Sequence, residues 1–391
     1  MRRAAAVLCT AAAMGLAATS AYLLGLLAAA LAGARRPLPP RTALPPRFVV
    51  LVPAHDEEAQ IAATVAALGK LGYAGEWETI VVADNCADRT AEVARAAGAT
   101  VWERSDPLRG KGAALAWGLD RVRAEHAAAE AVAVVDADCI PSPNLLDAFA
   151  ARMAAGAAAV QADYVVSNPG DSPASAVRYA AFALMNTVRP SGKEALGLSC
   201  GLLGTGMAFT AGLLERVPWD AFGITEDGEY HVRLVAAGER VVFAREASVR
   251  SPMPTTFTAS EVQQARWEGG RLALATRQAP ALMARALRSG DPRGLNAAFE
   301  LAVPPQAMLL GLNAAVGAAA FVLRAPAAVR LAVASLGGQA LFVVGGLAFA
   351  RAPARVYAAL LLAPLLVGRK VALMMRVASG RASAAWVRTP R

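Results

Sequence analysis

Short apolar runs alternate with alanine-rich stretches of helical spacing from Phe48 onward. Phe48–Pro53 is a continuous apolar run of strand length, and Glu57 to Leu71 follows it with apolar residues at helical spacing. This alternation is typical of βα units around a mainly parallel sheet. It predicts the α/β fold class. Further strands are expected at Thr79–Ala83, Thr100–Trp102, Ala131–Val135 and Ala158–Tyr164. Further helices are expected at Thr90 to Ala97, Gly112 to Ala124 and Gly228 to Ala237.

Long apolar segments lie towards both ends of the chain. Ala4 to Gly33 holds 30 residues without a charge, a length that at about 1.5 Å per residue exceeds the ~30 Å hydrocarbon core of a bilayer. A signal peptide is the alternative, although its apolar region usually has only ~7–15 residues. Leu301–Leu323 and Leu331–Ala350 are also long enough to span. Val356–Gly368 is shorter and suits a helix at the membrane interface.

These patterns divide the chain into five expected parts. From Arg245 to about Pro292 the sequence is more polar and predicts helix, which places a linker before the last hydrophobic segments. The expected parts are an N-terminal transmembrane anchor over 1–36, an α/β domain over 47–275, an interfacial linker over 276–300, transmembrane or interfacial helices over 301–376, and a basic cytoplasmic tail over 377–391.

Composition and charge favour a membrane protein and give no support for a nucleic-acid partner. Hydrophobic residues make up 56% of the 391 positions, more than a soluble core needs. The net charge is +9, but basic residues do not alternate with aromatic ones, as a nucleic-acid surface would require. They flank the apolar segments instead, at Arg35, Arg36, Arg41, Arg47, Arg351, Arg355, Arg369, Lys370 and Arg376. The positive-inside rule then predicts a multi-pass protein of the plasma (inner) membrane with a cytoplasmic α/β domain.

Acidic residues follow three of the predicted strands, where ligands of α/β sheets gather. His55-Asp56-Glu57 follows the first strand, Asp84-Asn85 the second, and Asp136-Ala137-Asp138 the fourth. Asp136 and Asp138 stand two residues apart in an extended segment, so both carboxylates can face one Mg²⁺ or Mn²⁺ ion. Such an ion neutralises charge on a leaving diphosphate. A single acid such as Asp56 has the simpler interpretation of a turn or cap residue.

Two further clusters each allow a chemical and a structural interpretation. Thr225-Glu226-Asp227 precedes a predicted helix, where acids stabilise the first turn or where one of them acts as a general base. In Gln263-Gln-Ala-Arg-Trp267, Arg266 can make forked hydrogen bonds to phosphate and Trp267 offers a flat face to a sugar ring. An Arg-Trp pair on an amphipathic helix is also a common packing element.

In order and spacing, these motifs resemble those of the family 2 glycosyltransferases. The resemblance covers about Phe48 to Leu274 and rests on Phe48-Val-Val-Leu-Val-Pro-Ala-His-Asp-Glu57, Val82-Ala-Asp-Asn-Cys-Ala-Asp88, Asp136-Ala-Asp138, Thr225-Glu-Asp227 and Gln263-Gln-Ala-Arg-Trp267. The chain is similar to the membrane-bound branch with cellulose, chitin and hyaluronan synthases and ceramide glucosyltransferases. The resemblance implies a GT-A fold and inverting transfer of a sugar from a nucleotide-sugar donor, expected to be a UDP-sugar.

The resemblance also implies roles for individual residues. Asp227 would be the catalytic base, while Asp136 and Asp138 would hold the metal. Residues implied at the donor are Pro53, Ala54, His55, Glu57, Asp84, Lys111, Asp136 and Arg266. Residues implied around the acceptor and the diphosphate are Gly204, Thr205, Gly206, Glu226, Gln263 and Trp267.

Three interpretations of the overall activity stay open. About three spans are few for a polymer channel, unless the chain forms a homo-oligomer or adds a partner subunit, so we expect a membrane lipid or carrier-linked glycan acceptor. A processive polysaccharide synthase is the alternative because it uses the same motifs. A non-catalytic nucleotide-binding scaffold is disfavoured by the intact carboxylates. A dinucleotide-binding fold is disfavoured because no G-x-G-x-x-G follows the first strand.

Overall fold

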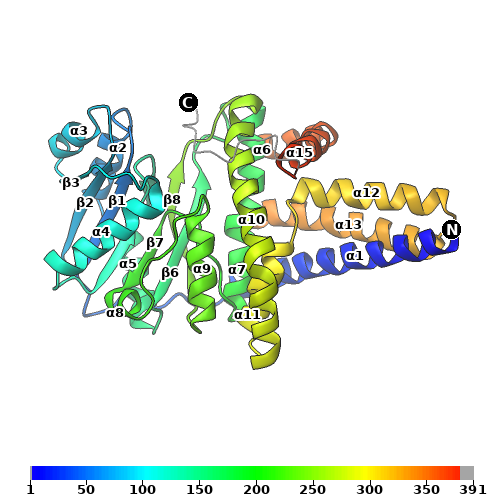
Figure 1. Ribbon diagram of the computed structural model, residues 1–391, viewed down its shortest axis with the longest axis horizontal. Coiled ribbons are helices and arrows are strands. Elements are labelled where there is room, and N and C mark those ends of the chain that lie inside the picture. Colours follow the sequence, from blue (N-terminus) through cyan, green and yellow to red (C-terminus); the bar gives the residue numbers. More distant parts are fainter. Residues whose placement is uncertain (1, 379–391) are drawn as a thin grey trace.

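The computed structural model describes residues 2–378, apart from the side chains of Ser260, Val262, Gln263 and Ala378. An α/β domain lies at one end of the molecule and a bundle of long helices extends from the other (Figure 1). The chain enters through the bundle, builds the α/β domain, and returns to the bundle.

A single mixed sheet forms the centre of the α/β domain, in the order β3-β2-β1-β4-β7-β6-β8-β5. Its first four strands are parallel, as the predicted βα units require, and β7 then runs antiparallel between β4 and β6. The strands are β1 Phe48–Ala54, β2 Trp77–Asp84, β3 Thr100–Arg104, β4 Ala131–Val134, β5 Ile140–Pro141, β6 Ala159–Val166, β7 Met207–Thr210 and β8 Val241–Ser251.

Helices cover both faces of this sheet, which explains the continuous apolar runs in its central strands. Alternate residues of β1 join different cores: Val50 and Val52 pack on one face, Val49 and Leu51 on the other. The first face is covered by α2 Ile61–Leu68, α3 Thr90–Ala96 and α5 Leu145–Ala154. The second face is covered by α4 Lys111–Glu125, α8 Ala211–Arg216 and α9 Glu226–Ala236.

The helix expected from Arg245 begins later, because β8 extends to Ser251 and α10 Phe257–Ser289 follows it. Charged residues within β8 interrupt its apolar run, so the hydrophobic pattern does not predict a strand there. Glu246 is neutralised by Arg152 of α5, whose guanidinium donates to both of its carboxylate oxygens at 2.8 and 2.9 Å. Helix α10 also runs across the domain boundary expected at 275/276 without a break.

A continuous helical segment lies between the sheet and the bundle (Figure 1). It consists of α6 Pro173–Phe182, the π-helical η1 Ala183–Val188 and α7 Arg189–Ala195. Helix α7 approaches the N-terminal helix so closely that a Cβ atom at Gly192 would lie 2.2 Å from the Leu26 carbonyl oxygen.

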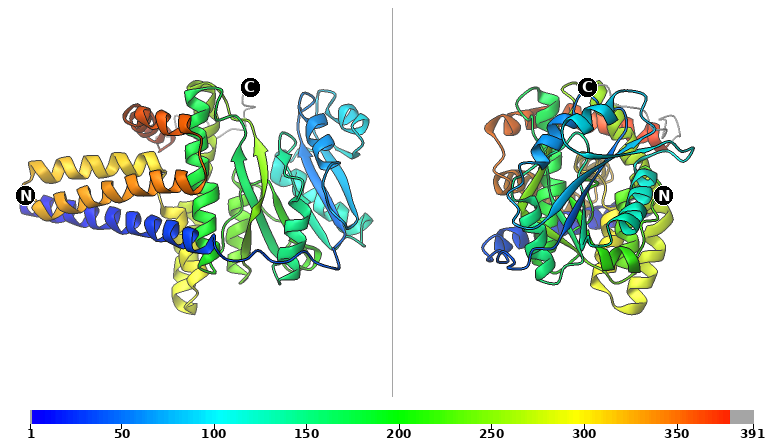
Figure 2. Two further views of the ribbon diagram at one scale, coloured as in Figure 1. Left: turned by 180° about the vertical axis from the view of Figure 1, so that it is seen from behind. Right: turned by 90° about the vertical axis from the view of Figure 1, so that its left-hand side faces the viewer.

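The bundle consists of α1 Arg2–Gly33, α12 Gln306–Val322 and α13 Pro326–Phe349, which lie side by side in Figures 1 and 2. By length and composition, three helices of the described chain can cross a membrane: α1, α13 and the helix over Ala354–Val377. The single segment expected over Leu301–Leu323 is broken instead. Helix α11 Pro292–Ala302 meets α12 at 71°, where Pro304 and Pro305 remove two backbone donors.

The last described segment turns away from the bundle. It comprises α14 Ala354–Ala359, η2 Leu360–Leu362 and α15 Ala363–Ala378. Helix α15 lies crosswise to α1, α12 and α13 (Figures 1 and 2), the direction expected of a helix at the interface. From residue 379 the predicted tail lies outside the described residues.

Candidate active site

Asp136 and Asp138 follow β4 at the carboxyl edge of the sheet. The Asp136 N–H donates to Thr205 Oγ1 at 3.0 Å, and the Ser251 hydroxyl donates to Asp138 Oδ2 at 3.4 Å. Oxygens of both carboxylates and the Cys139 sulfur lie within 4.8 Å of one another. Burial raises the pKa of the Cys139 thiol, which keeps it protonated. The donor set is therefore two carboxylates, which suits a hard divalent cation.

Lys111, the first residue of α4, supplies the positive charge beside this pair. Its ammonium lies 2.6 Å from Asp136 Oδ1 and 3.6 Å from Glu226 Oε1, and it donates to the Gly204 carbonyl at 2.7 Å. Burial raises the pKa of Asp136 to about 6 and that of Glu226 to about 7, against the opposing effect of Lys111. Burial alone would lower the pKa of Lys111, but these carboxylates raise it. The ammonium is therefore charged at neutral pH.

The Gly204-Thr205-Gly206 loop closes one side of the cluster. Both glycines have positive φ, at 82° and 63°, which favours glycine. A Cβ atom at Gly204 would lie 3.3 Å from the Lys111 ammonium and 3.5 Å from Asp227 Oδ2. At Gly206 it would lie 2.7 Å from a Val249 methyl carbon. The loop thus brings backbone atoms close to the charged groups.

Glu226 and Asp227 form the first turn of α9. Asp227 Oδ1 accepts the N–H of Gly228 at 2.8 Å, and the acid lies in the first turn of the helix, where the helix dipole favours negative charge. Its other oxygen faces the Gly204 loop. Burial raises the pKa of Asp227. One oxygen therefore positions the carboxylate and the other points to the cluster.

Helix α10 packs against this turn. A Cβ atom at Gly270 would lie 2.6 Å from a Thr225 methyl carbon. Burial lowers the pKa of Arg266, and the charge of Glu226 opposes that shift. Trp267 packs against Phe182, with ring centroids 6.0 Å apart. The side chain of Gln263, also expected here, lies outside the described residues.

The ends of β1 and β2 form a second part of the site. Pro53 and Ala54 are the last residues of β1, and His55 Nδ1 lies 2.7 Å from the Asp84 carbonyl oxygen. Asp84 is only 5% exposed, and its Oδ1 accepts Arg104 Nη1 at 2.5 Å and Asn85 Nδ2 at 3.1 Å. The Asp84 carboxylate is thus fixed beneath the loops that follow both strands.

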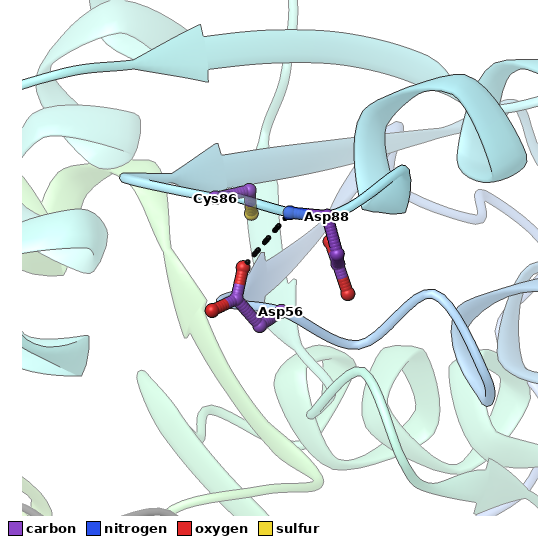
Figure 3. A group of neighbouring side chains, drawn as sticks. All are labelled: Asp56, Cys86 and Asp88. Carbon is purple, nitrogen blue, oxygen red and sulfur yellow. Dashed lines mark hydrogen bonds between the residues drawn. The ribbon is translucent and has the colours of Figure 1, made fainter.

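Asp56, Cys86 and Asp88 form another compact group in these loops (Figure 3). Asp56 Oδ1 accepts the N–H groups of Ala87 and Asp88 at 2.7 and 3.3 Å. Asp88 Oδ2 accepts the Glu58 N–H at 3.1 Å. These carboxylates join the loops after β1 and β2, which agrees with the turn interpretation of Asp56. Glu57 belongs to the same connection through its N–H, which donates to Thr90 Oγ1 at 2.7 Å.

Sequence reasoning missed Arg104 and Ser251, which hold Asp84 and Asp138. Arg104 is the last residue of β3 and Ser251 the last of β8. Both occupy the same kind of strand end as the acids that were identified. Ligands gather at the carboxyl ends of strands, and a basic residue at such an end is as informative as an acid, so Arg104 at the end of β3 could have been found from the sequence. Ser251 also required β8 itself to be identified.

The family described as Glycosyltransferase like family 2 matches residues 45–270, more than half of the chain. The chain belongs to this family. It is therefore a glycosyltransferase that uses a nucleotide-sugar donor. Comparison with curated protein sequences gives no significant match.

Solved structures similar to this glycosyltransferase include the mannosyltransferase PcManGT from Pyrobaculum calidifontis in complex with GDP-Man and Mn²⁺. It is 21% identical, with a TM-score of 0.54, and the match covers 89% of this chain and 98% of that chain. Glucosyl-3-phosphoglycerate synthase from Mycobacterium tuberculosis, in complex with Mn²⁺, UDP and phosphoglyceric acid, is 23% identical over 58% and 78% of the two chains, with a TM-score of 0.41. The first similarity shows the GT-A fold.

Proposed function

We propose that this glycosyltransferase transfers its sugar, with inversion, to a membrane lipid or a lipid-carried glycan on the cytoplasmic face. The observation that supports a transfer reaction is the single cluster of Lys111, Asp136, Glu226 and Asp227, built from β4, α4 and α9. It combines a cation for phosphate, a carboxylate of the metal pair and a carboxylate free to take a proton.

Asp136 and Asp138 would hold Mg²⁺ or Mn²⁺. PcManGT was solved with Mn²⁺ and GDP-Man, and the mycobacterial synthase with Mn²⁺ and UDP. When bound, the ion would neutralise charge on the departing nucleoside diphosphate. Lys111 would bind an oxygen of the same diphosphate, since its ammonium lies beside Asp136. Asp84 and the residues from Pro53 to Glu57 would line the nucleoside pocket, and a UDP-sugar is the donor that we propose.

Asp227 would remove the proton from the acceptor hydroxyl as it attacks the anomeric carbon. Its Oδ2 faces the Gly204 loop, and the Gly228 N–H holds the other oxygen. Lys111 is close enough to affect the pKa of Asp227, and it opposes the rise caused by burial. Lys111 thus favours the ionised form of Asp227, which is the form that a base needs, against the effect of burial.

The placement of α10 supports a membrane acceptor. This helix carries Arg266 and Trp267 beside the Asp227 turn, and α15 is tied to it by ion pairs of Arg369 with Glu261 at 2.6 Å and Lys370 with Glu268 at 2.5 Å. An acceptor held at the level of α15 would reach the site along α10. Gly204, Thr205, Gly206, Gln263 and Trp267 would surround it.

The test is a panel of radiolabelled nucleotide sugars incubated with membranes that contain the full chain and Mn²⁺. We expect label from one donor to enter the organic phase as glycolipid, and membranes with Asp138→Ala to show none. Label in long, water-soluble polymer would favour a processive synthase. No incorporation from any donor, with nucleotide binding intact, would favour the non-catalytic scaffold.

A further inference from the structure

Arg178, in α6, is largely buried, and its Nε atom lies inside the protein without a hydrogen-bond partner. Only 8% of the residue is exposed, and Arg178 has no hydrogen bond or ion pair within the described part of the chain. Burial lowers the pKa of Arg178 to about 10, so it still carries its charge at neutral pH. A buried charge without a partner is costly to a fold, and its presence needs a reason.

Aromatic rings surround this charge but leave its donors unused. Its ζ carbon lies 5.5 Å from the ring centre of Phe182 and 5.4 Å from that of Trp267. Stacking on ring faces leaves the in-plane N–H groups of a guanidinium without acceptors. Arg121 makes a useful contrast, since it also lies over two rings, Trp102 and Trp117, yet donates to Glu125 at 2.7 Å. Within the described residues, no carboxylate lies at ion-pair distance from Arg178.

Arg178 lies between the metal pair and the membrane-side helices. Phe182 packs against Tyr164, and burial together with the neighbouring Cys139 and Asp138 raises the pKa of the Tyr164 hydroxyl. On the other side, Glu268 is the acid whose charge Arg178 feels most, and Lys370 of α15 already binds it. Arg178 therefore lies on the side of the metal pair towards α10 and α15, where the proposed acceptor enters, whereas Lys111 lies beside Asp136 on the side proposed for the donor diphosphate.

We propose that Arg178 binds the phosphate of an anionic lipid acceptor. A guanidinium fork matches two phosphate oxygens, and the cluster of Val166, Phe182, Met253 and Trp267 offers apolar surface to the first carbons of a lipid chain. The inference rests on the proposed function and narrows its acceptor class to lipids that carry phosphate near the accepting group. It also gives the unpaired charge its missing partner.

The test measures binding of octyl phosphate to the full chain in dodecyl maltoside, with octanol and inorganic phosphate as comparison ligands. Arg178→Met is compared with wild type and with Arg121→Met, which removes an arginine stacked on two rings elsewhere. We expect octyl phosphate to bind on the order of 10- to 100-fold more weakly to Arg178→Met. Wild type and Arg121→Met should bind it equally, and octanol should not distinguish the three proteins.

Thermal unfolding separates recognition from a structural role. Arg178→Met removes an unpaired buried charge, so its melting temperature should equal or exceed that of wild type. Unchanged octyl phosphate affinity in Arg178→Met, or lost affinity with a lower melting temperature, would overturn the proposal. Inorganic phosphate binding as tightly as octyl phosphate would also overturn it, in favour of a site for free anions. None of these measurements uses donor turnover, so this proposal and the proposed function can fail separately.

Discussion

Among single residues, Asp227 has the most direct chemical consequence. Replacing it with asparagine keeps the shape and the contact with the Gly228 N–H but removes the proton acceptor. We expect Asp227→Asn to lower the transfer rate by roughly 10²–10⁴-fold. Donor affinity, measured with metal and nucleotide, should change little. Asp220→Asn is the control, because that acid is exposed and pairs with Arg233. Near-normal transfer by Asp227→Asn would remove this residue from the role of base.

Asp163 of β6 provides a pH prediction outside the catalytic cluster. Burial raises its pKa to about 7, against the opposing effects of Thr187 and Arg250. The Thr187 hydroxyl lies 2.9 and 3.1 Å from the two carboxylate oxygens and donates to them. The unfolded chain ionises near its ordinary pKa of about 4. Between these values the native state binds more protons, so stability falls as pH rises, by at most about 4 kcal/mol.

Asp163→Asn removes this dependence while it keeps a polar group beside Thr187. Its melting temperature should therefore exceed that of wild type near pH 8, and the difference should shrink near pH 5. Asp171→Asn, at an exposed position in the next loop, should show no such trend. Equal differences at both pH values would mean that Asp163 titrates as an ordinary surface acid.

The sequence places acids at strand ends but does not reveal which distant residues meet them. Asp136 and Asp138 are recognisable because the strand before them is a continuous apolar run. The contact of Lys111 with the Gly204 carbonyl joins residues 93 positions apart. The burial of Arg178 likewise depends on α6 packing against α10, which no local pattern records. Residue types are thus predictable, whereas their partners depend on the folded topology.

For the strands, too, the sequence predicts those with a clear local pattern and not those that depend on pairing with distant segments. Strands β1 to β4 follow the βα pattern, and their positions are confirmed. Strand β7 has only four residues, Met207–Thr210, and is held by pairing with β4 and β6 on both sides. A segment that short carries too little periodicity to identify. Strand β8 is longer, but Arg245, Glu246 and Arg250 interrupt its apolar run, so the hydrophobic pattern does not predict a strand there.

The contact between α7 and α1 gives a prediction about elements. A Cβ atom at Gly192 would lie 2.2 Å from the Leu26 carbonyl oxygen, which is backbone and cannot rotate away. We expect Gly192→Ala to separate the two helices and to destabilise the protein by about 1–3 kcal/mol. Gly15→Ala in α1 is the matched control, because nothing lies within 4 Å of its added carbon. Thermal unfolding in detergent measures both. If Gly192→Ala and Gly15→Ala melted at the same temperature, the close approach of α7 to α1 would not be needed for the packing of these two helices.

For the whole molecule, the distribution of arginine and lysine argues for one orientation in the membrane. The first turn of α1 and the turn between α12 and α13 lie at the end of the bundle away from the α/β domain (Figure 1). Basic residues at that far end are Arg2, Arg3, Arg324 and Arg330. More basic residues lie at the domain end: Arg35, Arg36, Arg41, Arg47, Arg351, Arg355, Arg369, Lys370 and Arg376. The excess favours a cytoplasmic α/β domain.

Single cysteines test this orientation in a variant whose four native cysteines are replaced by alanine. Leu44→Cys reports the domain side, where Leu44 is 87% exposed, and Val322→Cys reports the far end, where Val322 is 72% exposed. With a membrane-impermeant maleimide on intact spheroplasts, we expect labelling of Val322→Cys alone. Leu44→Cys should react only after lysis, because the nucleotide-sugar site would then face the compartment that holds its donor. Labelling of Leu44→Cys in intact cells would show that the α/β domain faces the outside. The proposed transfer from a cytoplasmic nucleotide sugar would then be wrong.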